Sequence, residues 1–281
     1  DGVEVVILYP SGKVSPVQEK QLTTLGKNIH ALEVQGTFDD CQAMVKTAFA
    51  DTDVTDKLFL TSANSINVAR WLPQQFYYFF AWKQWNDKDK PPVISVPSGN
   101  FGNICAGILA MQSGLPVKHF IAASNINDIV SDYLQTQLLK PKAALPTLSN
   151  AMDVGNPSNF VRILEIFNNQ FPELKKRLSS FTITDQETRE TIRRVYTDYN
   201  YLLDPHGAVG YLSLKRYLAD HLSDQGIFLE TAHPVKFPDA VEKETGHSIT
   251  LPESVRSIMD AEKKSTVIKP SYNSLKEFLL N

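Results

Sequence analysis

Residues 93–110 read VISVPSGNFGNICAGILA, a stretch that predicts a buried strand, a tight turn and an apolar helix in direct succession. Val93–Val96 is a short β-branched run typical of a strand inside a parallel sheet, and Pro97 ends it. Residues 98–103 are mostly small or polar, and Ile104–Met111 continues as an apolar helix. Such a turn directs backbone N–H groups and the positive end of a helix dipole at one spot. An anion fits that spot, and phosphate fits it best.

The two glycines of this turn support the same interpretation. Gly99 and Gly102 would let the backbone approach phosphate oxygens without a Cβ in the way. Their spacing matches neither the Walker pattern nor GxGxxG, which argues against a bound nucleotide. An ordinary strand-to-helix turn can carry the same two glycines, so the turn by itself leaves both interpretations open.

The string PSGNFGN at residues 97–103 resembles the phosphate-binding loop of threonine synthases, which are pyridoxal-phosphate (PLP) enzymes of the tryptophan-synthase-β type. Further strings resemble the same family and follow in the same order. They are SANSIN at 62–67, LSNAMD at 148–153, DPHGAV at 204–209 and TAHPVKF at 231–237. The resemblance implies an α/β fold with two parallel-sheet domains of PLP fold type II, incomplete at the N-terminus, and pyridoxal 5'-phosphate as cofactor.

Strand and helix signals alternate near the start of the chain, which favours parallel βαβ units. Apolar runs at residues 3–9, 29–34 and 58–61 predict three strands. Between the first two runs, Ser15 and Gln18 form the sequence signature of a capping box at a helix start.

We therefore expect residues 1–62 to form part of a small α/β domain and residues 63–281 to form the large PLP-binding domain. The aromatic-rich stretch 67–85 predicts a long core helix. Residues 159–199 have helical periodicity and many charges, so a helical insertion is expected around residues 140–205. The C-terminal tail is interpreted as helical.

Composition is that of a soluble globular protein: 42% hydrophobic residues, 21% charged residues and a net charge of −3. This balance lacks the basic footprint of nucleic-acid binding, and the apolar runs are too short to cross a membrane. Cys41 and Cys105 lack CxxC spacing and predict buried thiols of a cytoplasmic protein rather than a disulfide or a metal site. No metal is expected.

By resemblance, Gly99, Asn100, Phe101 and Asn103 contact the phosphate of PLP, mostly through backbone N–H groups. Relatives often carry Asp where this chain has Asn103. The ring nitrogen of PLP is expected to meet Thr231, whose hydroxyl can donate to an unprotonated pyridine. Without the family, Thr231 would be an ordinary residue at a strand end.

A second phosphate site is expected at the start of the long helix. Ser65 and Asn67 would lie at its N-terminus, and Arg70 could offer a bidentate fork one turn on. The resemblance assigns these three residues to the phosphate of O-phospho-L-homoserine, the small-molecule substrate of threonine synthase. A helix cap with a surface arginine is the alternative. His206 and His233 are left out of the catalytic list, since an isolated histidine is more often structural.

The resemblance implies conversion of O-phospho-L-homoserine and water to L-threonine and phosphate, the last step of threonine biosynthesis. Two alternatives remain open: a related phospho-lyase that releases an oxo acid and ammonia, and a non-catalytic module that binds a phosphate ligand. Ser149, Asn150 and Asp153 are expected to line the cleft without a defined role.

The family's Schiff-base lysine lies in an FKDFG-like string upstream of the matched region, and no lysine of this chain stands in such a string. No catalytic residue is therefore assigned, and the chain alone is expected to be inactive. The apolar run from Val3 to Tyr9 is expected to form a sheet edge that pairs with a missing N-terminal segment or with another copy.

Overall fold

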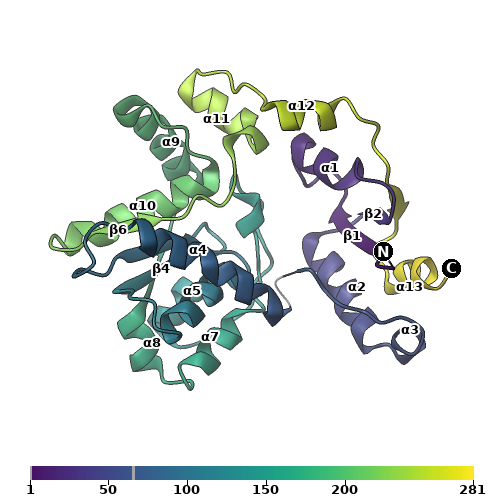
Figure 1. The fold of residues 1–281 in the computed structure, drawn as a ribbon, viewed down its shortest axis with the longest axis horizontal. Helices are drawn as coiled ribbons and strands as arrows, with labels where there is room; N and C mark the ends of the chain where they lie inside the picture. Colours follow the sequence, from purple (N-terminus) through teal and green to yellow (C-terminus); the bar gives the residue numbers. More distant parts are fainter. Residues whose placement is uncertain (1, 65–66) are drawn as a thin grey trace. The chain divides into compact units, whose positions relative to one another are not determined.

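The computed structural model describes residues 2–64 and 67–281, and it divides the chain into two compact units (Figure 1). The first unit combines the residues up to Thr61 with residues 249–281, and the second comprises residues 62–248. Each unit contains a parallel sheet with helices around it, which confirms the predicted α/β class. Within the described ranges, no helix combines the length and apolar character that a bilayer crossing requires.

The first unit contains, in chain order, β1 (Val5–Pro10), α1 (Pro16–Thr23), β2 (Ile29–Val34), α2 (Phe38–Ala50), α3 (Thr52–Thr55), α12 (Glu253–Met259), β7 (Thr266–Ile268) and α13 (Tyr272–Leu280). Its sheet has the strand order β1-β2-β7, with all pairs parallel and Leu32 opposite Thr266. Leu32 and Val34 pack with Met44 of α2 and Leu275 of α13, so these two helices share a core with β2.

Local capping starts the first helices of this unit. The Ser15 hydroxyl accepts from the backbone N–H of Gln18, whose side chain accepts from the Ser15 N–H at 3.0 Å, so the predicted capping box is confirmed. Thr37 and Asp40 form a second box at the start of α2. Each box satisfies backbone N–H groups that have no partner within their own helix.

Two expectations for the first unit are wrong. Residues 58–61 form no strand, because Phe59 is exposed and Leu60 reaches the core of the unit without backbone pairing. Residues 249–281, grouped with the large domain from sequence, belong to the first unit because β7 pairs with β2. A three-residue strand is too short to leave a periodic signal in a tail that is otherwise helical.

The second unit contains, in chain order, η1 (Val68–Arg70), α4 (Trp71–Gln84), β3 (Val93–Pro97), α5 (Gly102–Gln112), β4 (His119–Ser124), α6 (Ile129–Thr136), η2 (Asn150–Met152), α7 (Phe160–Ile166), α8 (Phe171–Arg177), β5 (Leu178–Thr182), α9 (Asp185–Tyr199), α10 (Pro205–Asp220), β6 (Gly226–Phe228), η3 (Pro234–Lys236) and α11 (Pro238–Thr245). The strand, turn and helix predicted for residues 93–110 correspond to β3, the connecting turn and α5.

The sheet of the second unit has the order β5-β4-β3-β6 with every pair parallel. Both faces of its central strands are covered. Ile94 and Phe120 pack into the core shared with α4, α5 and α7, while Val93 and Ile121 pack with Leu214 of α10. Burial on both faces explains why β3 has an unbroken apolar sequence rather than an alternating one.

The expected helical insertion contains a strand. β5 lies within it and pairs in parallel with β4, with Leu178 opposite Phe120. Leu178 is the one fully buried residue of β5, because this strand lies at the edge of the sheet. Apolar and polar residues alternate little in β5, and helical patterns flank it on both sides. The strand was therefore not predicted from sequence.

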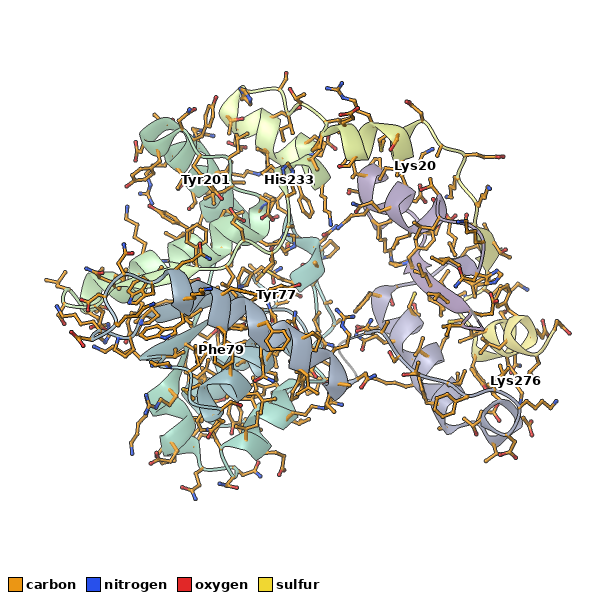
Figure 2. All side chains as sticks on the ribbon, in the orientation of Figure 1. Lys20, Tyr77, Phe79, Tyr201, His233 and Lys276 are labelled. Atoms are coloured by element: carbon orange, nitrogen blue, oxygen red, sulfur yellow. The ribbon has the colours of Figure 1, made fainter. Side chains whose placement is uncertain are left out.

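The aromatic helix α4 buries only some of its large side chains, contrary to the expectation of a core helix. Trp71 and Tyr78 are buried, and the Tyr78 hydroxyl donates to the carbonyl oxygen of Asn103 at 2.6 Å. This bond joins α4 to the turn after β3. Other large side chains of the helix are exposed, namely Leu72, Phe76, Tyr77, Phe79 and Phe80. Figure 2 labels Tyr77 and Phe79.

Gly107 sets how closely α4 and α5 approach. A Cβ at this position would lie 2.5 Å from the Tyr78 ring and 2.9 Å from the Phe120 ring. Both rings are fully buried and pack edge to face, so neither has free space into which it could move. A glycine is therefore required here by packing, although it lowers intrinsic helix propensity.

We expect Gly107→Ala to lower the free energy of unfolding by about 1–3 kcal/mol, because overpacking outweighs the gain in helix propensity. Gln112→Ala, at an exposed position of the same helix, should change it by less than about 0.5 kcal/mol. Urea unfolding followed by circular dichroism measures both. A Gly107→Ala protein as stable as wild type would contradict the packing argument.

Candidate functional site

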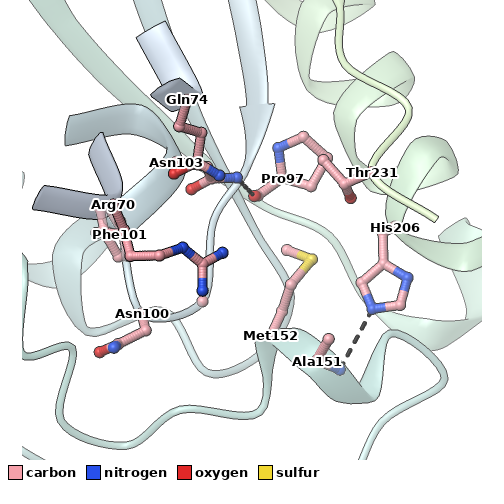
Figure 3. Close-up of a pocket in the computed structure, with 12 residues that line it drawn as sticks. Arg70, Gln74, Pro97, Asn100, Phe101, Asn103, Ala151, Met152, His206 and Thr231 are labelled. Carbon is pink, nitrogen blue, oxygen red and sulfur yellow. Dashed lines mark hydrogen bonds between the residues drawn. The ribbon is translucent and has the colours of Figure 1, made fainter. Parts of the chain in front are cut away.

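A pocket of about 250 Å³ opens at the carboxyl end of β3 in the second unit (Figure 3). It is formed by η1 and the start of α4, the turn after β3, η2, the start of α10 and Thr231 in the segment after β6. Its lining consists of Arg70, Gln74, Pro97, Gly99, Asn100, Phe101, Gly102, Asn103, Ala151, Met152, His206 and Thr231. Carboxyl ends of parallel strands are the usual place for ligands in α/β sheets.

Phe101 shapes the turn between β3 and α5. Its φ is 63°, in the left-handed region that bulky side chains rarely adopt. Its ring is buried and packs edge to face against Phe160, with the ring centroids 5.7 Å apart. Packing thus holds a conformation that costs about 1–3 kcal/mol in isolation, and such outliers cluster at ligand sites. The N–H groups of the first turn of α5 have no intrahelical partner and lie at this turn.

Gly99 lies directly against η2. A Cβ there would be 2.7 Å from the Met152 Cα and 2.8 Å from the Ala151 carbonyl oxygen. Both neighbours are backbone atoms, which cannot rotate away as a side chain could. Glycine is therefore needed for close packing of the two segments as well as for ligand access.

Asn103 braces the turn from within. Its amide nitrogen donates to the Pro97 carbonyl oxygen at 2.7 Å, and its amide oxygen accepts from the Ile104 N–H at 2.9 Å. An ionised aspartate could make only the second of these bonds, because it has no donor. The asparagine at this position is thus suited to the geometry of this turn.

Asn100 connects the turn to the start of α7. Its side-chain oxygen accepts from the N–H and the hydroxyl of Ser158 at 2.8 and 2.9 Å. Its carbonyl oxygen accepts from the Asn159 side chain at 3.0 Å. These bonds fix the orientation of Asn100 before any ligand arrives.

Arg70 ends η1, and its guanidinium group points into the pocket in Figure 3. Asn67 caps η1 by accepting from the Ala69 N–H at 3.0 Å, and its amide donates to the Ser62 carbonyl oxygen. Asn67 is not among the residues that line the pocket. Ser65, the third residue assigned to this phosphate site, lies outside the described residues.

Thr231 follows β6, which pairs with β3, so the sheet brings the residue to the turn. Hydrogen bonding continues beyond the strand, because the Leu229 N–H donates to the Ser95 carbonyl oxygen at 3.0 Å. Thr231 and the residues of the turn, far apart in sequence, therefore line the same pocket (Figure 3).

His206 lines the pocket although sequence reasoning left it aside. Its ring is buried, its Nδ1 lies 2.7 Å from Asp204 Oδ1, and its Nε2 accepts from the Ala151 N–H at 3.3 Å. Asp204 is the N-cap of α10 and is fully buried. Burial acts to raise the pKa of Asp204, but hydrogen bonds from His206 and Glu230 outweigh it and hold that pKa below its usual range.

Glu230 carries a second carboxyl group next to Asp204. The residue as a whole is exposed, but its carboxyl end packs against Gly207, where a Cβ would collide with it. Removal of water from this carboxyl end, with the hydrogen bond to Asp204 and its charge, raises the pKa of Glu230 to about 9. Glu230 is therefore protonated at neutral pH and donates to the Asp204 carboxylate.

The residues of the LSNAMD string that line the pocket are not the ones expected from sequence. Ser149 and Asp153 accept hydrogen bonds from the buried side chain of Asn125 at 3.1 and 2.9 Å, and so hold the segment that carries η2. Ala151 and Met152, in the same string, line the pocket instead. Ser149, Asn150 and Asp153 are not among the lining residues.

Six of the eight predicted binding residues line the same pocket: Arg70, Gly99, Asn100, Phe101, Asn103 and Thr231. Gly102, which the sequence analysis placed in the anion-binding turn, also lines it. Sequence reasoning missed the other lining residues, which are Gln74, Pro97, Ala151, Met152 and His206. Gln74 follows Arg70 by one helical turn, and that spacing was a signal available in the sequence. The other four missed residues could have been suspected only from their presence in the quoted strings; they are Pro97, Ala151, Met152 and His206.

Comparison with known families gives two matches. Residues 2–229 match the family described as pyridoxal-phosphate dependent enzyme, and residues 207–279 match the family described as threonine synthase, C-terminal. The chain is 44% identical to the threonine synthase of Serratia marcescens over 279 residues, which cover 99% of this chain and 64% of that protein.

Solved structures agree. The threonine synthase of Escherichia coli superposes with a TM-score of 0.92 at 44% identity, covering 99% of this chain and 64% of that one. A PLP-bound threonine synthase from Brucella melitensis gives 0.87 at 35% identity, covering 99% of this chain and 65% of that one. The chain thus spans slightly less than two thirds of the length of these relatives.

We expect Gly99→Ala to weaken binding of inorganic phosphate about tenfold or more, because the η2 backbone must shift to admit a Cβ. Gln112→Ala is the control, because it truncates an exposed side chain at the opposite end of α5 from the turn. Titration followed by calorimetry measures both dissociation constants. Equal phosphate affinity in wild type and Gly99→Ala would disprove the role of this close contact.

A second prediction concerns Glu230. Its pKa is higher in the folded than in the unfolded chain, so the wild type loses stability as pH rises from about 4.5 towards 9. Glu230→Gln keeps a donor for Asp204 and removes this titration. We expect the melting temperature of the variant, relative to wild type, to rise between pH 5 and pH 8.5.

Glu190→Gln is the control for net charge, because it removes one carboxyl from the exposed surface of α9. Differential scanning calorimetry at both pH values compares the two variants. A Glu230→Gln protein that follows the Glu190→Gln protein at both pH values would mean that Glu230 is ionised in the folded state.

Proposed function

Because the chain belongs to the family of pyridoxal-phosphate dependent enzymes, we propose that it provides the cofactor and substrate phosphate sites of a threonine synthase. The proposed reaction converts O-phospho-L-homoserine and water to L-threonine and phosphate. One observation carries the proposal: a single pocket is lined both by the turn at residues 99–103 and by Arg70. A cofactor phosphate and a substrate phosphate require two anion sites close together.

The residues present fit PLP. The turn at residues 99–103 has a glycine where the backbone is closest, and the start of α5 directs N–H groups and a helix dipole at the same place. In the proposed complex Gly99, Asn100, Phe101 and Asn103 hold the cofactor phosphate. PLP, when bound, supplies the electron sink for elimination and replacement chemistry at the substrate's carbon atoms.

Thr231 is proposed to face the pyridine nitrogen. Its hydroxyl can donate a hydrogen bond to an unprotonated nitrogen, whereas a carboxylate would keep that nitrogen protonated. Glu230, the adjacent residue, keeps its proton at neutral pH and donates it in a hydrogen bond to Asp204, so Glu230 adds no negative charge there. A neutral ring nitrogen suits elimination and replacement better than transamination.

Arg70 is proposed to hold the substrate phosphate. A guanidinium group presents paired donors that match two phosphate oxygens, and such charge-assisted bonds are stronger than neutral ones. Arg70 is exposed and reaches into the pocket from the end of η1, so a phosphate can enter and leave past it. Ser65 and Asn67 remain predicted contributors at the start of this segment.

The covalent step of a PLP enzyme needs a lysine amine, and no lysine is among the described residues that line the pocket. This chain is accordingly assigned binding and orientation of cofactor and substrate, and no catalytic residue. With PLP and borohydride we expect no single lysine of this chain to be labelled stoichiometrically.

The test separates the two phosphate sites. We expect Arg70→Ala to weaken binding of O-phospho-L-homoserine about 10- to 100-fold, the loss of a charge-assisted pair, while the dissociation constant for PLP changes less than about threefold. Arg194→Ala, at an exposed position of α9, should alter neither constant. Equilibrium dialysis of both ligands measures the effects. Equal losses for PLP and substrate would disprove the division into two sites.

Product analysis separates the enzyme classes. The chain is mixed with PLP, O-phospho-L-homoserine and the part of the Escherichia coli threonine synthase outside the match. We expect threonine and phosphate in equal amounts. An oxo acid with ammonia would identify a phospho-lyase, and tight binding of both ligands with no turnover would favour a non-catalytic binding module.

A further inference from the structure

His206 occupies a buried position between the start of α10 and η2. Its ring packs against Phe237, with centroids 5.0 Å apart, and is 2% exposed. Each ring nitrogen has one polar neighbour, Asp204 at Nδ1 and the Ala151 N–H at Nε2. With both nitrogens engaged, the ring is arranged to hold two segments together rather than to exchange protons with a ligand.

The neighbours of the ring determine where its proton lies. Asp204 Oδ1 accepts from the backbone N–H of His206 at 2.8 Å and lies 2.7 Å from Nδ1, and Asp204 Oδ2 accepts from the Gly207 N–H at 3.3 Å. An ionised carboxylate can only accept, so Nδ1 must donate to it. The Ala151 N–H can only donate, so Nε2 must carry a lone pair. The two contacts together select the neutral, Nδ1-protonated imidazole.

The segment held by Nε2 forms a wall of the anion-binding turn. Ala151 lies in η2, and its carbonyl oxygen and the Met152 Cα would be 2.8 and 2.7 Å from a Cβ at Gly99. No side chain separates the two backbone segments at this contact. A displacement of Ala151 away from His206 therefore changes the space available at Gly99.

We propose that His206 is a positioning residue for the cofactor phosphate: as a neutral acceptor held by Asp204, it fixes η2 against Gly99 and so sets the shape of the turn that binds phosphate. The identity of that ligand rests on the proposed function, whereas the contact from His206 to Ala151 does not. His206 acts through Ala151 and need not touch the ligand (Figure 3).

Two substitutions of His206 by side chains of similar length test whether it acts by accepting a hydrogen bond or only by filling space. In His206→Gln the side-chain oxygen can replace Nε2 as acceptor, while in His206→Met the thioether sulfur is a weak acceptor. The Met variant loses both the acceptor for Ala151 and the donor for Asp204, whereas the amide of the Gln variant can supply both. We expect PLP and inorganic phosphate to bind about tenfold more weakly to the Met variant, and within about threefold of wild type to the Gln variant.

Hydrogen exchange at the Ala151 amide tests the contact without any ligand. We expect protection in wild type and His206→Gln, and in His206→Met faster exchange at Ala151 than the loss of global stability in that variant accounts for. Equal protection of Ala151 in the two variants would overturn the inference. Should the Met variant fail to fold, the ring nitrogens of wild type decide by NMR: a proton on Nδ1 supports the inference, and a proton on Nε2 overturns it.

Failure of the proposed function leaves a different pattern. Loss of PLP binding in wild type, with phosphate binding and Ala151 exchange still dependent on the acceptor, would contradict the proposed cofactor and leave His206 as the positioning residue of an anion site. PLP binding that is equal in the Gln and Met variants would support the cofactor and overturn the role of His206.

Discussion

The pocket depends on one constraint, the parallel arrangement of the strands in the second unit. Parallel strands end at the same edge, so whatever follows β3 and β6 must meet there. The turn after β3 and Thr231 after β6 become neighbours in this way. The residue after β4, Asn125, binds Ser149 and so holds the segment that carries η2. Each part of the pocket can thus be traced to a strand end or to a segment bound to one.

Close backbone packing turns this edge into a site of defined shape. Gly99 allows η2 to contact the turn directly, and Gly107 allows α4 to approach α5 closely enough for Tyr78 to bind Asn103. Phe101 retains a left-handed conformation because its ring is buried against Phe160. Because the turn is already ordered without a ligand, phosphate binding carries no free-energy cost for ordering it, which favours tight binding of a ligand phosphate.

The two proposed anion sites differ in kind, and the difference suits the proposed chemistry. Backbone N–H groups of a rigid turn suit a phosphate that stays bound, as a cofactor does. The exposed side chain of Arg70 suits a phosphate that arrives with the substrate and leaves as product. Nearby, Asp204 carries one negative charge while Glu230 keeps its proton, so the buried carboxyl pair adds little repulsion to anions in the pocket.

The sequence by itself determined the fold class and the strand-turn-helix at residues 93–110, and it predicted most of the proposed binding residues that line the pocket, because these depend on short contiguous patterns. Local patterns could not identify β5 and β7, since an edge strand and a three-residue strand are recognisable only by their partners. For the same reason the tertiary structure alone assigned residues 249–281 to the first unit. It alone also gave His206 its position, because a histidine's role depends on which donor and which acceptor the fold brings to its two nitrogens.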